Sequence, residues 1–397
     1  MSIKSYLISL VAGISLFTCF AICCPVAQAG EFVTKLADQV EFSGFVRFIA
    51  GYSDNLVDDM HNIISDRSEH DPFWVHTAGF TRLRFSITGP DAEGCKTRGF
   101  VDGDFRGSGG DGAKLRMRQA WMGIKSPDEN WELFFGQKES ILCSMISYKY
   151  TLSLEGDIGA GTLYQRSPGI QLFRYFGPYH TALGIMKASG AGPGTGKLND
   201  GYSDQPSYTL RSGYKGEDFE GWLAFRYDNS KESFRPEDLD KYTNNAGWLL
   251  TGEAEWRLKP LSLYGTWYWG EGSAYPHIFR KFEDDGGPLQ NLILINSKED
   301  KTRGAMVGVR STINRFSVAL SAGYMEVEDG DGNWTNIVGR DTEGKSLDQM
   351  TYRLVTKYQF GKALWVGLEF VHSELSGMRE AEDYKGQSCL MHINYNF

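Results

Sequence analysis

The feature that most constrains this chain is an alternation of apolar and polar residues, repeated in segments of about ten residues from Glu41 onward. In the segment 248–258 the even positions include Trp248, Leu250 and Trp256, whereas the odd positions from 251 to 257 carry threonine, glutamate and arginine. A period of two places successive side chains on opposite faces of a β-strand. The pattern therefore predicts strands with one apolar face and one polar face.

Counted in this way, the sequence predicts an all-β chain of sixteen strands. They lie near 41–52, 79–88, 98–106, 114–125, 131–137, 169–176, 179–189, 207–215, 219–227, 247–258, 261–271, 302–313, 316–327, 348–360, 364–373 and 389–397. Gln119 and Arg174 fall on the apolar phase, and 179–189 fits either phase, so counts from fourteen to eighteen remain open. An even number lets an antiparallel sheet close with both chain ends on one side.

The connections between these segments alternate between short and long. Tight turns are expected at 176–178, 215–218, 259–260, 314–315 and 361–363, and long polar segments at 53–78, 228–246, 272–301, 328–347 and 374–388. Transmembrane barrels have short periplasmic turns and longer external loops. The alternation predicts a transmembrane antiparallel β-barrel. A soluble sandwich or propeller is the alternative, but it would bury its apolar face rather than place aromatic residues toward strand ends.

The composition agrees with membrane strands and disfavours membrane helices. Aromatic residues make up 14% of the chain and the mean hydropathy is −0.36, while no apolar run after Ala29 approaches the ~20 residues that a helical span needs. The formal net charge of −9 disfavours nucleic acid as a partner.

The first 29 residues have the pattern of a secretory signal peptide. Lys4 is followed by an apolar stretch from Tyr6 to Ile22, and Ala27-Gln28-Ala29 is a small-x-small cleavage site. We expect cleavage near Ala29, a periplasmic lead-in at 30–40 and the barrel at 41–397. A retained membrane anchor is the alternative, but the apolar run is short.

Several consecutive segments resemble the trimeric porins of the Gram-negative outer membrane. Thr81-Arg82-Leu83-Arg84-Phe85 is similar to their second strand, and Val101-Asp102-Gly103-Asp104-Phe105 to the acidic strand that follows. The segments 115–124 and 133–137 resemble the next two strands, the second of which leads into the constriction loop. The terminal residues Tyr395 and Phe397 are similar to the signal that the barrel-assembly machinery reads.

The resemblance implies a homotrimer in the outer membrane, in contact with lipid and lipopolysaccharide. It implies a water-filled channel for passive diffusion of small hydrophilic solutes and ions, without a cofactor. A substrate-selective channel, possibly preferring anions, is the alternative within this class. The loop segment Leu154-Glu155-Gly156-Asp157-Ile158-Gly159 departs from the acidic tip that the family usually carries.

Arginine is abundant at inward positions of the early strands, and the long segment 138–168 follows the fifth strand. We expect a basic pore wall facing an acidic loop, which would set a transverse field across a constriction. The expected wall residues are Arg47, Arg82, Arg84, Arg98, Arg116 and Arg118, and the expected loop acids are Glu139, Glu155 and Asp157. Arginines that merely line a solvated lumen are the simpler interpretation.

Other motifs indicate neither an enzyme nor a metal site. Gly107 to Gly112 matches a dinucleotide-binding pattern, but an alternating strand follows where a helix is required. Asp329 to Arg340 resembles a calcium loop without its turn glycine and terminal acid, so a loose divalent site is the weaker interpretation. An outer-membrane hydrolase is the competing class, yet no residues assemble catalytic roles. Cys95, Cys143 and Cys389 show no disulfide or metal spacing.

Overall fold

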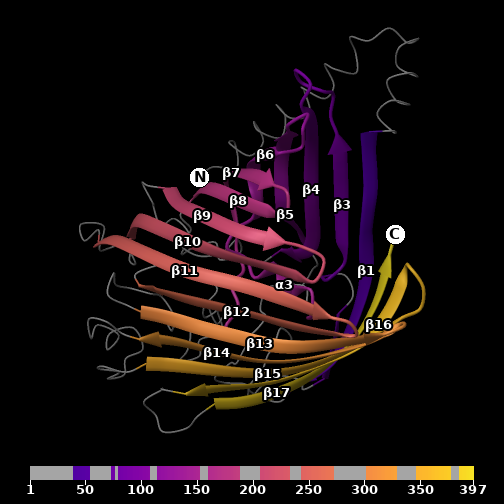
Figure 1. Ribbon diagram of the computed structural model, residues 1–397. Helices are drawn as coiled ribbons and strands as arrows, with labels where there is room; N and C mark the ends of the chain where they lie inside the picture. Colours follow the sequence, from indigo (N-terminus) through magenta and orange to yellow (C-terminus); the bar gives the residue numbers. More distant parts are fainter. Residues whose placement is uncertain are drawn as a thin grey trace, which may run out of the picture.

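The chain folds into a closed antiparallel β-barrel, as the alternation predicted (Figure 1). The computed structural model describes residues 39–53, 73–76, 79–107, 114–152, 160–187, 206–232, 243–271, 301–328, 346–376 and 384–397. The signal peptide and nearly all of the lead-in lie outside these residues, so their boundaries stay predictions. None of the helices in the described part is long and apolar enough to cross a membrane.

Seventeen strand segments form the wall within the described residues. They are β1 (Val40–Ser53), β2 (Phe73–His76), β3 (Arg82–Thr88), β4 (Lys96–Gly107), β5 (Lys114–Lys125), β6 (Trp131–Glu139), β7 (Arg166–Phe176), β8 (Tyr179–Lys187), β9 (Pro206–Lys215), β10 (Phe219–Glu232), β11 (Thr243–Leu258), β12 (Leu261–Glu271), β13 (Lys301–Ile313), β14 (Phe316–Glu328), β15 (Ser346–Gln359), β16 (Leu364–Ser376) and β17 (Tyr384–Asn396). The short helix α3 (Met145–Tyr148) interrupts the connection between β6 and β7.

Two of these segments share one position in the wall, so the barrel has the sixteen strands that were predicted. β2 pairs with the end of β1 at Ile49–Tyr52, and β3 pairs with its beginning at Val40–Phe45. β2 lies within the stretch 53–78, which the sequence predicted to be loop; that prediction was wrong for these four residues. β17 pairs with β1 from Phe45↔Asn396 to Ser53↔Ser388, which closes the ring.

The even strand number places all short turns and the C-terminus at one end of the barrel. The connections at 177–178, 216–218, 259–260, 314–315 and 360–363 lie at this end, which we call the short-turn end. Phe397 reaches the same end and exchanges two backbone hydrogen bonds with Gly44 of β1, with N···O distances of 3.1 and 3.2 Å. In the barrel proteins of the outer membrane this end faces the periplasm.

The outer face carries large apolar side chains, which suits contact with lipid. Aromatic rings gather toward both ends, as in the interfacial girdles of membrane barrels. At the short-turn end, exposed rings include Phe176, Tyr179, Phe219, Trp256, Phe316, Tyr358 and Phe397, and at the other end Tyr52, Tyr208, Tyr227 and Trp269. Polar side chains of the same strands point into the lumen, where many are buried.

Candidate functional site: the lumen and its inward loop

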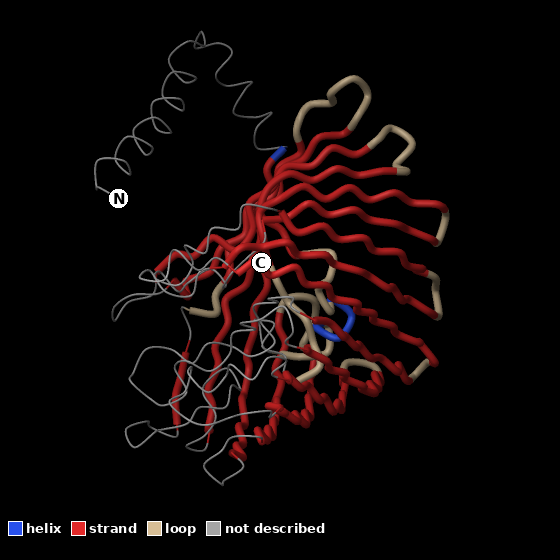
Figure 2. Tube along the Cα trace, turned by 90° about the vertical axis from the view of Figure 1, so that its left-hand side faces the viewer, coloured by secondary structure: helices blue, strands red, loops and turns tan. Residues whose placement is uncertain are grey.

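The described parts of the connection between β6 and β7, 140–152 and 160–165, fold into the barrel rather than outward, and α3 lies inside the ring of strands (Figure 2). Its apolar side chains Leu142, Ile146, Leu152 and Leu163 are buried in one cluster with inward-facing residues of the wall. These wall residues come from β10 to β16 and include Trp222, Tyr264, Met306, Val355 and Trp365. Burial of this apolar surface fixes the loop against this part of the wall.

Polar contacts fix the loop further, and Glu253 of β11 makes the main one. Its carboxylate accepts the backbone N–H groups of Ile146 and Ser147 at 2.8 and 2.6 Å, and the indole N–H of Trp222 at 3.2 Å. The acid is 3% exposed. A buried carboxyl group that accepts three hydrogen bonds holds its donors in place, because each donor would otherwise be left without a partner. Glu253 therefore anchors the start of α3 to the wall.

The far side of the loop reaches β1 across the lumen. Arg47 donates from Nη1 to the carbonyl of Leu152 at 2.6 Å and from Nε to Asn394 Oδ1 at 2.9 Å. In the part of the loop that leads back to β7, the backbone N–H of Ala160 donates a hydrogen bond to Thr351 Oγ1 at 3.2 Å. The loop thus lies against the wall at points far apart in the sequence, and it narrows the lumen between them.

The predicted basic wall faces the lumen on β1, β3 and β5. The guanidinium carbons of Arg47, Arg82 and Arg84 lie 4.9, 5.5 and 5.6 Å from the ring centre of Phe45, which points inward between them. Arg116 and Arg118 follow on β5, and Arg118 is 1% exposed. Five arginines therefore share one sector of the inner wall.

Two aspartates of β4 pair with these arginines, and sequence reasoning missed them. Asp104 binds Arg116 through both oxygens at 2.9 and 2.7 Å, and Arg118 Nη1 at 2.8 Å. Asp102 lies 3.5 to 3.7 Å from the Nε atoms of Arg82, Arg84 and Arg118. The alternating aspartates in 101–105, between two arginine-rich strands, were the signal that could have found these pairs.

Arg98 lies apart from the other five, nearer the short-turn end. It pairs with Glu132 at 2.9 Å, and its guanidinium carbon lies 5.4 and 5.1 Å from the rings of Trp121 and Phe134. The alternation within 114–125 predicts that Trp121 faces lipid, and this prediction is wrong. A β-bulge between Asp102 and Gly103 shifts the register of β5, so residues after Arg118 change phase and Trp121 points inward. The same bulge explains why Gln119 seemed misplaced in the alternation.

The expected loop acids do not all lie opposite the arginines. Glu139 belongs to β6, where its Oε1 accepts Gln119 Nε2 at 2.6 Å and Tyr164 Oη at 3.4 Å, on its own side of the lumen. Glu155 and Asp157 lie outside the described residues. Tyr164 Oη also accepts a hydrogen bond from Arg118 Nη2 at 3.4 Å. Burial raises the pKa of the Tyr164 phenol, which keeps the phenol protonated.

The lumen holds no arrangement suited to a metal or a cofactor within the described part of the chain. No group of three or more histidine, cysteine or acidic side chains there could hold a metal ion. Cys95, Cys143 and Cys389 form no disulfide with one another. β5 follows the glycine-rich segment 107–112, so a strand stands where a dinucleotide site requires a helix. The calcium-like segment 329–340 lies outside the described residues.

A sixteen-stranded barrel with an inward loop and a charged, polar lumen defines a membrane channel. The sequence model of the Gram-negative porins matches residues 16–378, and the chain belongs to this family. It is an outer-membrane channel. No curated protein matches the sequence significantly.

Solved structures of outer-membrane channels share the fold. The outer membrane channel DcaP of Acinetobacter baumannii is 19% identical, with a TM-score of 0.68 over 90% of this chain and 97% of that chain. The anion-selective porin from Comamonas acidovorans is 14% identical, with a TM-score of 0.58 over 90% and 99% of the two chains. OmpT of Vibrio cholerae is 11% identical, with a TM-score of 0.55 over 90% and 97%.

Proposed function

We propose that this protein is a passive diffusion channel that prefers small hydrophilic anions. The observation that carries the proposal is the charge of the inner wall, where four arginines share two aspartates and Arg47 lies beside them. Arg84 keeps 37% of its side chain exposed beside the pairs, so it remains accessible to a solute. A narrow passage with an excess of fixed positive charge raises the local concentration of anions.

The inward loop supports the proposal by bringing solutes near that wall. The loop packs on β10 to β16 and also contacts β1 through Arg47, so we expect a solute to pass close to Arg84 and Arg116, the more exposed arginines of the wall. Fixed charges act strongly over short distances: two unit charges ~4 Å apart interact by ~1 kcal/mol in water and ~4 kcal/mol at an effective dielectric constant near 20. The wall therefore selects by charge more than by specific fit.

A hydrolase remains the competing class, and it makes a different prediction. Catalysis needs a nucleophile, a base and an orienting group within hydrogen-bond reach. Incubation of the folded protein with phospholipid or peptide should release no product if the channel proposal is right. Released product that is lost together with a specific side chain would favour the enzyme.

Assembly and location follow the family in this proposal. We propose cleavage near Ala29, insertion by the barrel-assembly machinery through Tyr395 and Phe397, and a homotrimer in contact with lipid and lipopolysaccharide. The exposed apolar outer face supports a lipid or subunit environment. Mass determination of the mature chain and of the detergent-extracted oligomer tests these points.

Reversal potentials in planar bilayers with asymmetric salt test the anion preference. Wild-type channels should show a reversal potential of the sign given by anion selectivity. Arg82→Ala with Arg116→Ala should move that potential toward cations, because two positive charges leave the wall. The matched control is Arg315→Ala with Lys362→Ala, which removes two exposed charges from the turns. Cation selectivity of the wild type would overturn the proposal.

A further inference from the structure

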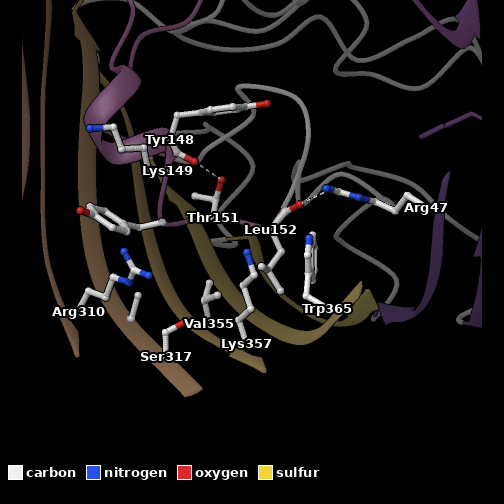
Figure 3. Close-up of a pocket in the computed structure, with 12 residues that line it drawn as sticks. Arg47, Tyr148, Lys149, Thr151, Leu152, Arg310, Ser317, Val355, Lys357 and Trp365 are labelled. Atoms are coloured by element: carbon white, nitrogen blue, oxygen red, sulfur yellow. Dashed lines mark hydrogen bonds between the residues drawn. The ribbon is translucent and has the colours of Figure 1, made fainter. Parts of the chain in front are cut away.

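A cavity of about 250 Å³ lies between the inward loop and the inner wall at the short-turn end (Figure 3). Loop residues 148–152 cover it, and β13 to β16 form its other side with Arg310, Ser317, Val355, Lys357 and Trp365. Ser317, Lys357 and Trp365 lie within a few residues of the turns, so the cavity lies on the far side of the loop from the long connections.

Two cations enter this cavity without an acidic partner. Arg310 and Lys357 extend from neighbouring parts of the wall toward the loop (Figure 3). Within the described residues, neither has a carboxylate at ion-pair distance, whereas Arg116, Arg226 and Arg353 elsewhere in the lumen each have one. Instead, the Arg310 guanidinium carbon lies 5.0 Å from the ring centre of Tyr150, and Lys357 Nζ lies 4.6 Å from that of Trp365.

A third cation at the edge of the cavity is also bound to neutral groups. Arg47 uses Nη1 and Nε for the Leu152 carbonyl and the Asn394 side chain. Lys149 lines the cavity as well, but its Nζ lies 3.4 and 3.9 Å from carboxylate oxygens of Glu220 and Glu255, which balance its charge. The cavity therefore carries an uncompensated positive charge that favours an anion.

Besides these cations and the polar side chains of Tyr148, Thr151 and Ser317, the lining includes apolar groups, which narrow the choice of anion. Leu152, Ala319 and Val355 lie beside the rings of Tyr150 and Trp365. A hydrated inorganic ion gains nothing from such a surface, whereas a flat apolar body does. A cavity of ~150 Å³ holds benzene, so this volume has room for one ring and a carboxylate. Arginine binds carboxylates through paired hydrogen bonds, and lysine adds a point charge.

We infer that this cavity is a binding site for a small aromatic carboxylate, held by Arg310 and Lys357 beneath the inward loop. The inference rests on the proposed function in one respect, that such solutes reach the lumen. Arg47 belongs both to the arginine wall and to the lining of this cavity, so an anion at the wall lies next to the site. The site would slow its exit and distinguish carboxylates with a ring from other small anions.

Equilibrium dialysis of labelled benzoate against the folded, detergent-solubilised protein tests the site without requiring conduction. Benzoate should bind saturably, and benzamide, which has the same shape without the charge, should not displace it. Arg310→Gln with Lys357→Gln should weaken benzoate binding at least tenfold. The matched control, Arg315→Gln with Lys362→Gln, removes the same charge from exposed turns at the same end and should leave binding within twofold.

A second variant keeps both cations and so guards against a folding defect. Ser317→Glu places a carboxylate in the cavity beside Arg310 and Lys357, and it should abolish benzoate binding by occupying the site. Ser317→Ala should retain binding. The inference is overturned if wild type binds benzoate no better than benzamide, if the turn variant loses binding as much as the cavity variant, or if Ser317→Glu binds normally.

Bilayer recordings separate this inference from the proposed function. An anion-preferring channel that binds no benzoate in dialysis would overturn the aromatic carboxylate site alone. A protein that binds benzoate through Arg310 and Lys357 but shows no anion preference would overturn the proposed function and support the site.

Discussion

Arg118 and Asp104 form a buried ion pair in the wall of the lumen, with Nη1 2.8 Å from Oδ2. The same carboxylate is bound by Arg116 from the solvent side, so one acid serves two cations of β5. The selectivity of the channel therefore depends on the aspartates of β4 as much as on the arginines.

Asp104→Asn tests this dependence. The substitution keeps the shape of the side chain but removes the charge that offsets Arg116 and Arg118, so the reversal potential should move toward anions. The expected change in anion occupancy is on the order of tenfold, since ~1.4 kcal/mol corresponds to that factor. Glu217→Gln, on an exposed turn, is the control and should have little effect. Movement toward cations would contradict the arrangement.

Glu253→Ala tests the anchor of the inward loop. Loss of the carboxylate leaves the N–H groups of Ile146 and Ser147 without their acceptor, and hydrogen bonds to charged groups contribute about 1.5–3 kcal/mol each. We expect a lower thermal unfolding temperature and noisier single-channel current, because the loop is less firmly held. Glu217→Ala should retain quiet openings. Identical current noise in Glu253→Ala and wild type would show that the apolar cluster alone holds the loop.

Glu155→Gln with Asp157→Asn tests the two acids predicted from the sequence. Both lie outside the described residues, but Leu152 and Ala160 on either side contact the inner wall. If the acids face the arginines, their removal should move the reversal potential toward anions with conductance largely kept. Exposed charges more than ~10 Å away would be screened by salt. An unchanged reversal potential would remove them from the constriction.

Deletion of Phe397 tests barrel closure and assembly. Its ring lies 5.4 Å from that of Phe42, and its backbone bonds to Gly44. A Cβ at Gly44 would clash with the Arg82 carbonyl oxygen and lie 2.9 Å from the Phe397 ring, so only glycine fits between β3 and the aromatic side chain. We expect low outer-membrane levels for the deletion, measured by immunoblot of membrane fractions. Arg84→Ala, a lumen substitution, should insert normally; normal levels of the deletion would refute the assembly role.

The turn after β5 provides a pH prediction outside the membrane-spanning strands. Hydrogen bonds from Lys125 and Lys96 lower the pKa of Glu129 from 4.5 to about 2. Because the folded pKa is lowered, the stabilisation is present above pH 4.5 and is lost as the pH falls toward 2. An NMR titration of the labelled Glu129 carboxyl should show this value, and Lys125→Ala should raise it toward 4.5. A midpoint near 4.5 in wild type would show that these contacts do not form in solution.

The sequence by itself determined the barrel. Alternation places apolar residues on the lipid face and polar residues in the lumen, and the even count with alternating turns requires closure. For this reason the phase of 248–258 was predicted correctly, since Trp256 faces outward. The sequence also indicated which arginines point into the lumen, because the period and phase of the alternation are local properties.

The tertiary structure alone decided which charges meet. The pairing of Asp102 and Asp104 with arginines depends on register across β3, β4 and β5, and a single bulge changed the phase of Trp121. The cavity at Arg310 and Lys357 forms only because a loop from β6 packs against β13 to β16, more than a hundred residues away. Such contacts are set by burial of apolar surface between distant segments, which no local period records.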